Sequence, residues 1–238
     1  PDIRDPNSDG DNLFLSSILA VDADTGEYRW HYQTTPRDRW DYTATQQIML
    51  ADLPLGEGGA DRRVVMQAPK NGFFYVLDAA DGELISATPF TAQNWTTGEF
   101  DENGRPVLIE EAVDLALYAV VPGPTGAHNW HPMAFNPDTG LVYIPVNEIP
   151  FFYDKTRNVE NSKSWWNVGY DVAAGWPVEY PAGTLDAVAD MDGGSLLAWD
   201  PVKAEPRWAV PFALPLNGGV LSTDAGLVFQ GNKFGDLV

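Results

Sequence analysis

The chain has no cysteine, and only three of its 238 residues are histidine. Without cysteine it can form no disulfide, hold no iron–sulfur cluster and attach no haem through a Cys-x-x-Cys-His motif. Three histidines without a thiolate partner also argue against a structural zinc site. No run of about 18 apolar residues occurs either, so the sequence predicts no membrane-spanning helix in this chain.

Basic residues are scarce as well, with 14 Lys and Arg against 34 Asp and Glu and a formal net charge of -20. Such a charge repels phosphate backbones and anionic lipid headgroups, so we expect no nucleic acid and no membrane surface as a partner. A basic protein partner is compatible with it. Residues 1–5 lack the basic stretch and apolar core of an export signal, so we expect an internal part of a longer protein.

Aromatic residues, glycine and proline are abundant, with nine Trp, 22 Gly and 19 Pro. This mixture of strand formers and turn formers favours an all-β architecture. Four segments share one pattern, in which an apolar strand is followed by Asp or Asn and then a turn. Their anchors Asp22, Asp78, Asn136 and Asp200 lie 56, 58 and 64 residues apart. In such a turn the Asx side chain caps the backbone, and a glycine four residues later supplies a positive φ.

Two of these segments carry a tryptophan eight residues after the anchor, Trp30 and Trp208, and in the fourth segment Ala204 replaces the glycine. A repeat of about 50 residues built from short strands is typical of β-propeller blades. We therefore predict that residues 1–238 form one partial β-propeller domain. It would have four-stranded antiparallel blades, tryptophan-docking repeats and an incomplete ring of about four blades.

Little of the sequence favours helix, and the best candidate, residues 110–118, is short. Two long segments near 91–127 and 148–190, rich in proline and tryptophan, are inserted between the strands. Insertions on a rigid β scaffold often carry binding surfaces, so we expect these two to do so.

Three short motifs place chemically useful groups in successive units of the repeat. Arg39-Trp40-Asp41-Tyr42 offers a carboxylate, Ala68-Pro69-Lys70-Asn71-Gly72 an amine, and His128-Asn129-Trp130-His131 an amide and an indole. Together these groups suit a flat, anionic, redox-active cofactor. Each also has a simpler interpretation: Asp41 as a turn cap, Lys70 as a solvated turn residue and Trp130 as core. The two histidines are predicted to be structural.

With Ala20-x-Asp22-x-x-Thr25-Gly26-x-x-x-Trp30 and His31-Tyr32-Gln33-Thr34-Thr35-Pro36, these motifs resemble the pyrroloquinoline quinone (PQQ) dependent alcohol dehydrogenases, which are eight-bladed quinoprotein propellers. The resemblance extends from Gly10 to Gly231. It implies that Asp41 is the catalytic base and a metal ligand, and that Lys70 hydrogen-bonds the quinone oxygens. By the same resemblance, Asn129 and Trp130 make further cofactor contacts.

The resemblance implies PQQ and calcium as cofactors. Relatives that use a lanthanide have a second acid two residues after the base, where this chain has Thr43, so calcium is favoured. The family's remaining calcium ligands, its vicinal disulfide and its stacking indole would lie upstream of residue 1. We therefore expect the isolated chain to be inactive. The family's tryptophan before Asn217-Gly218-Gly219 is Leu216 here, which predicts altered packing near the ring centre.

The implied reaction is oxidation of a primary or secondary alcohol to an aldehyde or ketone in the periplasm, with electrons passing to a c-type cytochrome or haem domain. Asp41 would take the hydroxyl proton, calcium would act as Lewis acid, and Lys70 would stabilise developing negative charge. We further predict an apolar funnel for the alcohol, formed by aromatic side chains of the insertions: Trp95, Phe151, Phe152, Trp165 and Trp166.

Two other functions fit parts of the pattern. A non-catalytic propeller could use the same docking repeats as a protein-binding scaffold, although a scaffold has no need of Asp41, Lys70 and Asn129–Trp130 together. A quinoprotein that oxidises sugars is the other alternative. The Trp40-Asp41-Tyr42 context favours alcohols.

Overall fold

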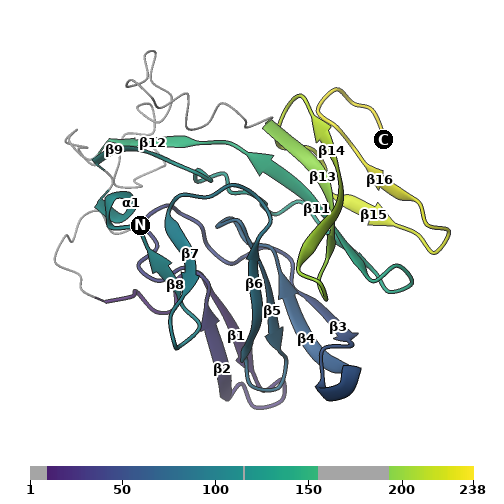
Figure 1. The fold of residues 1–238 in the computed structure, drawn as a ribbon, viewed down its shortest axis with the longest axis horizontal. Helices are drawn as coiled ribbons and strands as arrows, with labels where there is room; N and C mark the ends of the chain where they lie inside the picture. Colours follow the sequence, from purple (N-terminus) through teal and green to yellow (C-terminus); the bar gives the residue numbers. More distant parts are fainter. Residues whose placement is uncertain (1–9, 115, 155–192) are drawn as a thin grey trace.

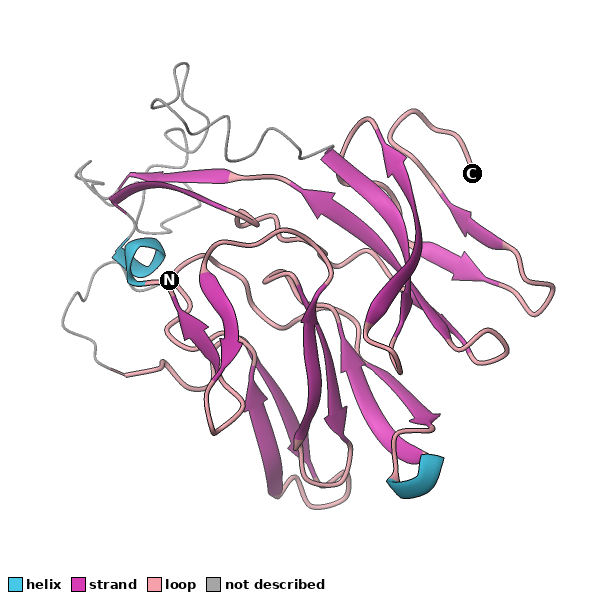
Figure 2. Cartoon of the chain, in the orientation of Figure 1, coloured by secondary structure: helices cyan, strands magenta, loops and turns pink. Residues whose placement is uncertain are grey.

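The computed structural model describes residues 10–114, 116–154 and 193–238, and nearly all of its regular structure is antiparallel β-sheet (Figures 1 and 2). One four-stranded sheet contains β3 (Met49–Leu53), β4 (Arg62–Gln67), β5 (Phe73–Asp78) and β6 (Leu84–Pro89). A second contains β10 (Ala134–Asn136), β11 (Leu141–Glu148), β13 (Gly193–Asp200) and β14 (Glu205–Phe212). In the first sheet neighbouring strands are consecutive along the chain, whereas in the second β11 pairs with β13, and the intervening strand belongs to another sheet. The predicted all-β propeller architecture is confirmed.

Four two-stranded sheets accompany these larger ones. They are β1 (Ser17–Val21) with β2 (Tyr28–Gln33), β7 (Thr96–Phe100) with β8 (Pro106–Leu108), β9 (Ala116–Val120) with β12 (Phe151–Asp154), and β15 (Val220–Ser222) with β16 (Val228–Gln230). Within the described ranges the sheets stand side by side and do not close into a ring, as expected for an incomplete propeller (Figure 1).

The predicted Asx turns form at all four anchors. Asp22 accepts the backbone N–H groups of Asp24 and Thr25 through Oδ1, at 3.1 and 3.0 Å. Equivalent caps occur at Asp78, Asn136 and Asp200. However, Asn136 joins β10 to β11, whereas Asp200 joins β13 to β14 of the same sheet. The last two anchors therefore belong to one sheet, because Asx capping serves any tight hairpin and does not identify a particular one.

Asp22, Asp78 and Asp200, the three anchors other than Asn136, mark equivalent hairpins with the same register. Each has a β-bulge directly after one cross-strand pair, and these pairs are Ala20–Trp30, Val76–Ser86 and Ala198–Trp208. A shared bulge gives each hairpin the same local twist. The residue at the position of Trp30 is therefore directed in the same way in each hairpin.

Two apolar cores lie between these elements. The first joins the β1–β2 hairpin, β5 and the insertion after β6, and its fully buried aromatic members include Trp40, Tyr42, Phe73, Tyr75 and Trp95. The second joins the two four-stranded sheets, where the rings of Phe74 and Trp199 lie 5.8 Å apart. Segments that are far apart in the sequence meet in both cores. Each sheet therefore depends on its neighbour to bury one of its faces.

The first insertion forms β7, β8, the short helix α1 (Glu110–Asp114) and β9. The helix predicted over 110–118 is wrong in its second half, because residues from Ala116 pair with β12 instead. Tertiary pairing overrides a weak helical pattern in such a short segment. Most of the second insertion, residues 155–192, lies outside the described residues. No helix within the described ranges is long and apolar enough to span a membrane.

Candidate functional site

Asp41 lies at the tip of a loop that follows β2 and is fixed by its two aromatic neighbours. Trp40 and Tyr42 are completely buried. The Trp40 indole N–H donates to the Ala112 carbonyl at 3.3 Å, and the Tyr42 hydroxyl donates to the Pro122 carbonyl at 2.7 Å. Because both neighbours are buried in the core, the Asp41 side chain remains 45% exposed. This carboxylate is therefore held in place and still accessible.

Asp38, which the sequence reasoning missed, holds the same loop from inside. Its buried carboxylate accepts the backbone N–H of Trp40 at 3.0 Å, of Tyr42 at 3.0 Å and of Thr43 at 3.2 Å. Asp41 and Thr43 have φ of 63° and 49°, a region that costs a non-glycine residue about 1–3 kcal/mol. The spacing Asp38-Arg39-Trp40 is typical of an Asx turn, and this signal could have identified Asp38.

Lys70 reaches Asp41 from the loop between β4 and β5. Its Nζ donates to the Asp41 carbonyl oxygen at 2.8 Å and to Asp41 Oδ2 at 3.3 Å, and its side chain is only 10% exposed. The adjacent Asn71 is buried and donates to the Thr34 carbonyl at 3.1 Å and to the Tyr75 hydroxyl at 2.9 Å. The structure thus brings two of the predicted site residues into direct contact, from successive sheets.

A third loop, residues 126–131, packs against the Lys70 loop. The Ala127 N–H donates to the Lys70 carbonyl at 2.9 Å. Gly126 has φ of 79°, and a Cβ there would lie 2.7 Å from Lys70 Cα, so only glycine fits. The buried His128 ring lies 2.6 Å from the Ala68 carbonyl and 2.7 Å from that of His131, and burial lowers its pKa. His128 therefore has the structural role that the sequence predicted.

Asn129 and Trp130 lie on this third loop, but their own contacts are local. Asn129 donates to the Thr125 carbonyl at 2.7 Å and accepts the Trp130 backbone N–H at 2.9 Å. The Trp130 side chain is 75% exposed and stacks on His131, with ring centroids 5.3 Å apart. Trp130 is therefore not core. The structure places the loop of these two residues beside Lys70, while the direct contact in the site is between Lys70 and Asp41.

The residues fit PQQ better than they fit a complete metal site. A sheltered ammonium group suits an anionic quinone, and the exposed Trp130 indole offers a flat face for a planar ring. Calcium needs about six to eight oxygen ligands. Within the part of the chain that the structure describes, no group of three or more His, Cys, Asp or Glu side chains could hold a metal. Asp41 is thus at most one ligand among several.

The predicted aromatic funnel is wrong for the three members that the structure describes. Trp95, Phe151 and Phe152 are all buried, and the Trp95 indole donates to the Asn71 carbonyl at 2.8 Å. The Trp95 ring also packs against Trp40 and Tyr42, so it supports the loops of Asp41 and Lys70. Composition alone could not distinguish the buried side of the insertion from its surface. Trp165 and Trp166 lie outside the described residues.

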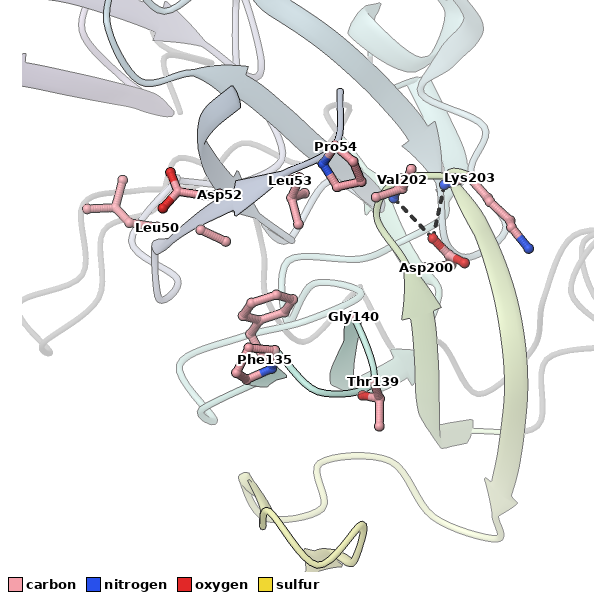
Figure 3. A pocket seen from close by; sticks show the side chains of 12 residues that line it. Leu50, Asp52, Leu53, Pro54, Phe135, Thr139, Gly140, Asp200, Val202 and Lys203 are labelled. Atoms are coloured by element: carbon pink, nitrogen blue, oxygen red, sulfur yellow. Dashed lines mark hydrogen bonds between the residues drawn. The ribbon is translucent and has the colours of Figure 1, made fainter. Parts of the chain in front are cut away.

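A separate groove of about 670 Å³ lies between the two four-stranded sheets (Figure 3). It is bounded by the end of β3, the β10–β11 turn and the β13–β14 turn, where Asp200 caps the N–H groups of Val202 and Lys203. Asp41, Lys70, Asn129 and Trp130 are not among its lining residues. The groove is therefore distinct from the candidate site.

Antiparallel sheets of up to four strands, standing side by side in chain order, define a β-propeller with a polar site where loops of successive sheets meet. The family described as "Glucose/ethanol/alcohol dehydrogenase, beta-propeller domain" (PQQ) matches residues 2–94. The chain is 49% identical to a quinohemoprotein alcohol dehydrogenase of Pseudomonas putida over 96% of its length, and 44% identical to that of Comamonas testosteroni over 99%. It spans 32% and 33% of these relatives, respectively.

Solved structures agree with the sequence matches. The fold resembles that of the Pseudomonas putida protein with a TM-score of 0.78, covering 94% of this chain and 33% of that one at 49% identity. It also resembles a europium-containing methanol dehydrogenase with a TM-score of 0.72 and 29% identity, covering 96% of this chain and 40% of that one. Over nearly its whole length, the chain is therefore similar to about a third of the length of the quinohemoprotein alcohol dehydrogenases.

Proposed function

We propose that this chain is the part of a PQQ-dependent alcohol dehydrogenase that carries the catalytic base, Asp41, and a cofactor-binding lysine, Lys70. The substrate would be a primary or secondary alcohol, and the product an aldehyde or ketone. The contact between Lys70 Nζ and Asp41, made between loops of successive sheets, is the observation that carries the proposal. The relatives named above are alcohol dehydrogenases, which supports the reaction class.

Asp41 is suited to accept the hydroxyl proton of an alcohol. Its side chain is 45% exposed, so a small substrate has access, and the hydrogen bond from Lys70 to Oδ2 orients it. The positive φ of Asp41 and the two buried neighbours limit its movement. A general base must lie within hydrogen-bond reach of the proton it removes, and such a fixed carboxylate meets this requirement at low entropic cost.

Lys70 has one N–H group more than its contacts with Asp41 use. An ammonium group carries three N–H donors, and the two acceptors on Asp41 occupy two of them. The third would bind an oxygen of the cofactor. PQQ, when bound, would supply the electrophilic carbonyl that accepts electrons from the alcohol. Asn129 and Trp130 would contact it from the neighbouring loop.

Asp41 would also be one ligand of calcium, and ligands outside the described residues would complete the coordination of the ion. Thr43 supports calcium over a lanthanide, although the methanol dehydrogenase that this fold resembles contains europium. A c-type cytochrome or haem domain would receive the electrons, in keeping with relatives named quinohemoprotein and 1-butanol dehydrogenase (cytochrome c). A periplasmic location rests on the resemblance to the family alone.

The decisive test replaces Asp41 by Ala in the natural protein that carries this sequence, loaded with PQQ and calcium. Ethanol-dependent reduction of an artificial dye is expected to fall by about 10²–10⁴-fold. Asp52→Asn is a matched control, because Asp52 also pairs with a basic side chain, Arg63 at 3.0 Å, but on an exposed surface. Wild-type turnover by the Asp41→Ala protein would refute the assigned base.

Two further measurements address the cofactors and the alternative function. Metal-free protein should regain dye reduction with PQQ and calcium, and a strict requirement for a lanthanide would contradict the choice of metal. The isolated 238 residues are expected to show no turnover, because their described part holds no metal-binding cluster. If the natural protein bound no PQQ at all, a non-catalytic scaffold would replace the enzymatic proposal.

A further inference from the structure

We propose that Asp38 is a positioning residue for Asp41, a role that rests on the proposed function of Asp41 as the base. Asp38 does not contact the open side of the site, since it is buried beneath the loop that carries Asp41. Its effect on the reaction would pass through the orientation of Asp41 and the contact of Asp41 with Lys70.

The two oxygens of Asp38 bind backbone groups on both sides of Asp41. Oδ1 accepts the Trp40 N–H at 3.0 Å, and Oδ2 accepts the Tyr42 N–H at 3.0 Å and the Thr43 N–H at 3.2 Å. The peptide units that flank Asp41 are thereby held by one buried carboxylate. Hydrogen bonds to an ionised acceptor are the stronger kind, so this clamp is well suited to maintain an unusual backbone.

The backbone that the clamp maintains is unusual at two positions. Asp41 and Thr43 both have positive φ, and Thr43 is β-branched, which makes that conformation rarer still. In this conformation Lys70 Nζ meets both the carbonyl oxygen and the carboxylate of Asp41. Without the clamp, the loop would relax toward ordinary φ values, and the pair of contacts would separate.

A second anchor ties Asp38 to the hairpin on the opposite side. The Ser16 hydroxyl donates to Asp38 Oδ2 at 2.6 Å, and Ser16 is itself buried. The Ser16 carbonyl in turn accepts the backbone N–H of Thr34 at 2.8 Å. Asp38 is therefore tied to the base of the β1–β2 hairpin as well as to the loop that it holds.

Asparagine is a sharp test of this clamp, because it keeps the shape of Asp38 but replaces one of its two acceptor oxygens by a donor group. Both oxygens of Asp38 receive backbone N–H groups. In either orientation of an asparagine amide, the NH₂ group would face another donor. In the natural protein loaded with PQQ and calcium, Asp38→Asn is expected to lower kcat by about 10–100-fold, the effect of a small misplacement of a catalytic group. Ser16→Ala removes one contact and should act in the same direction, by a smaller factor.

Three readouts separate positioning from a general loss of stability. Amide hydrogen exchange should accelerate at residues 40–43 in Asp38→Asn and stay unchanged in the 22–26 turn. Added to Asp41→Ala, Asp38→Asn should cause no further loss of the residual rate, because the group it positions is already gone. Asp78→Asn is the matched control: it removes another turn-capping carboxylate, away from the site, and should leave kcat unchanged.

The outcomes are distinguishable. An equal loss of rate in the Asp41→Ala background, or an unchanged kcat in Asp38→Asn, would overturn the positioning role. Unchanged amide exchange at 40–43 would overturn the clamp itself. Full turnover in Asp41→Ala alone would overturn the proposed base, and with it the reason for a positioning residue, whatever the exchange rates show.

Discussion

Two of the interfaces between successive sheets are packed in different ways. Where the β1–β2 hairpin meets the β3–β6 sheet, Trp30 is buried and its indole N–H donates to the Ala79 carbonyl at 3.2 Å. Its ring lies over Gly82, where a Cβ would come within 2.5 Å of the ring. Where the β3–β6 sheet meets the β10–β14 sheet, a groove of about 670 Å³ remains open at the same end of the strands.

The difference traces to one pair of positions. In the second interface, the residue equivalent to Trp30 is Ser86, and the residue equivalent to Gly82 is Ala204. The large ring and the glycine therefore occur together and are lost together, since a Cβ is tolerated only where no indole covers the turn. Docking requires two positions, the tryptophan of one hairpin and the glycine in the turn of the next. The tryptophan motif describes only the first of them.

The opposite end of the first interface carries the site, and Gly126→Ala should disrupt it most. The new Cβ would overlap the Lys70 side chain and lie 2.7 Å from its Cα, at a φ of 79°. We expect dye reduction by the holoprotein to fall by at least about 100-fold, because Lys70 and its contact with Asp41 are displaced. Gly140→Ala is the control, with a similar φ and no atom within 4 Å of its Cβ. An unchanged rate in Gly126→Ala would contradict the packing of this loop.

At the docking end, Gly82→Ala is expected to destabilise the protein by about 3 kcal/mol, the sum of an unfavourable φ and overpacking against Trp30. Gly26→Ala has a φ of 73° in the equivalent turn, with nothing within 4 Å of the added Cβ, and should cost only about 1 kcal/mol. Denaturant midpoints of the two variants provide the measurement. Equal losses would mean that Trp30 does not dock on Gly82.

Trp30→Phe tests the ring itself. It removes the hydrogen bond to Ala79 and part of the buried area, and we expect a loss of about 1.5 kcal/mol. Trp208 occupies the same register in its hairpin but is 40% exposed, so Trp208→Phe should change stability by less than about 0.5 kcal/mol. A comparable loss in both variants, measured by thermal unfolding, would remove the distinction between docked and undocked tryptophans.

The smallest effect is expected in the open interface. Ala204 has a φ of 54°, which is unfavourable for alanine and neutral for glycine. Ala204→Gly should therefore stabilise the protein by up to about 1 kcal/mol. The double variant Ser86→Trp and Ala204→Gly would then recreate the docked pair. If the glycine is what makes room for the indole, the double variant should be more stable than Ser86→Trp alone.

Sequence patterns predicted the local chemistry of the fold well. The Asx anchors, the positive φ of their glycines and the tryptophan positions follow from interactions within about ten residues, and these need no tertiary information. Asn136 shows the limit, because its cap is chemically identical to the others, while the sheet that surrounds it depends on distant strands. The helix over 110–118 failed for the same reason, since pairing of β9 with β12 decided its second half.

The site was harder to predict than the fold. Asp41 and Lys70 are 29 residues apart, and only the resemblance to a family joined them before the structure did. Asp38 and Gly126 were missed because their roles consist of contacts: a carboxylate beneath a strained loop, and a hydrogen where a methyl group would strike Lys70. Long-range contacts of this kind leave no periodic signal in a single sequence.

The aromatic cluster under the Asp41 loop couples the two charged groups of the site. Trp95 touches the rings of Trp40 and Tyr42, with centroids 5.5 and 5.6 Å apart, and its indole N–H holds the Asn71 carbonyl next to Lys70. A replacement at Trp95 would therefore move both charged groups at once. The exposed side chains around the site carry none of this framework, so they are the positions where a substitution can change the surface of the site and leave Asp41 and Lys70 in place.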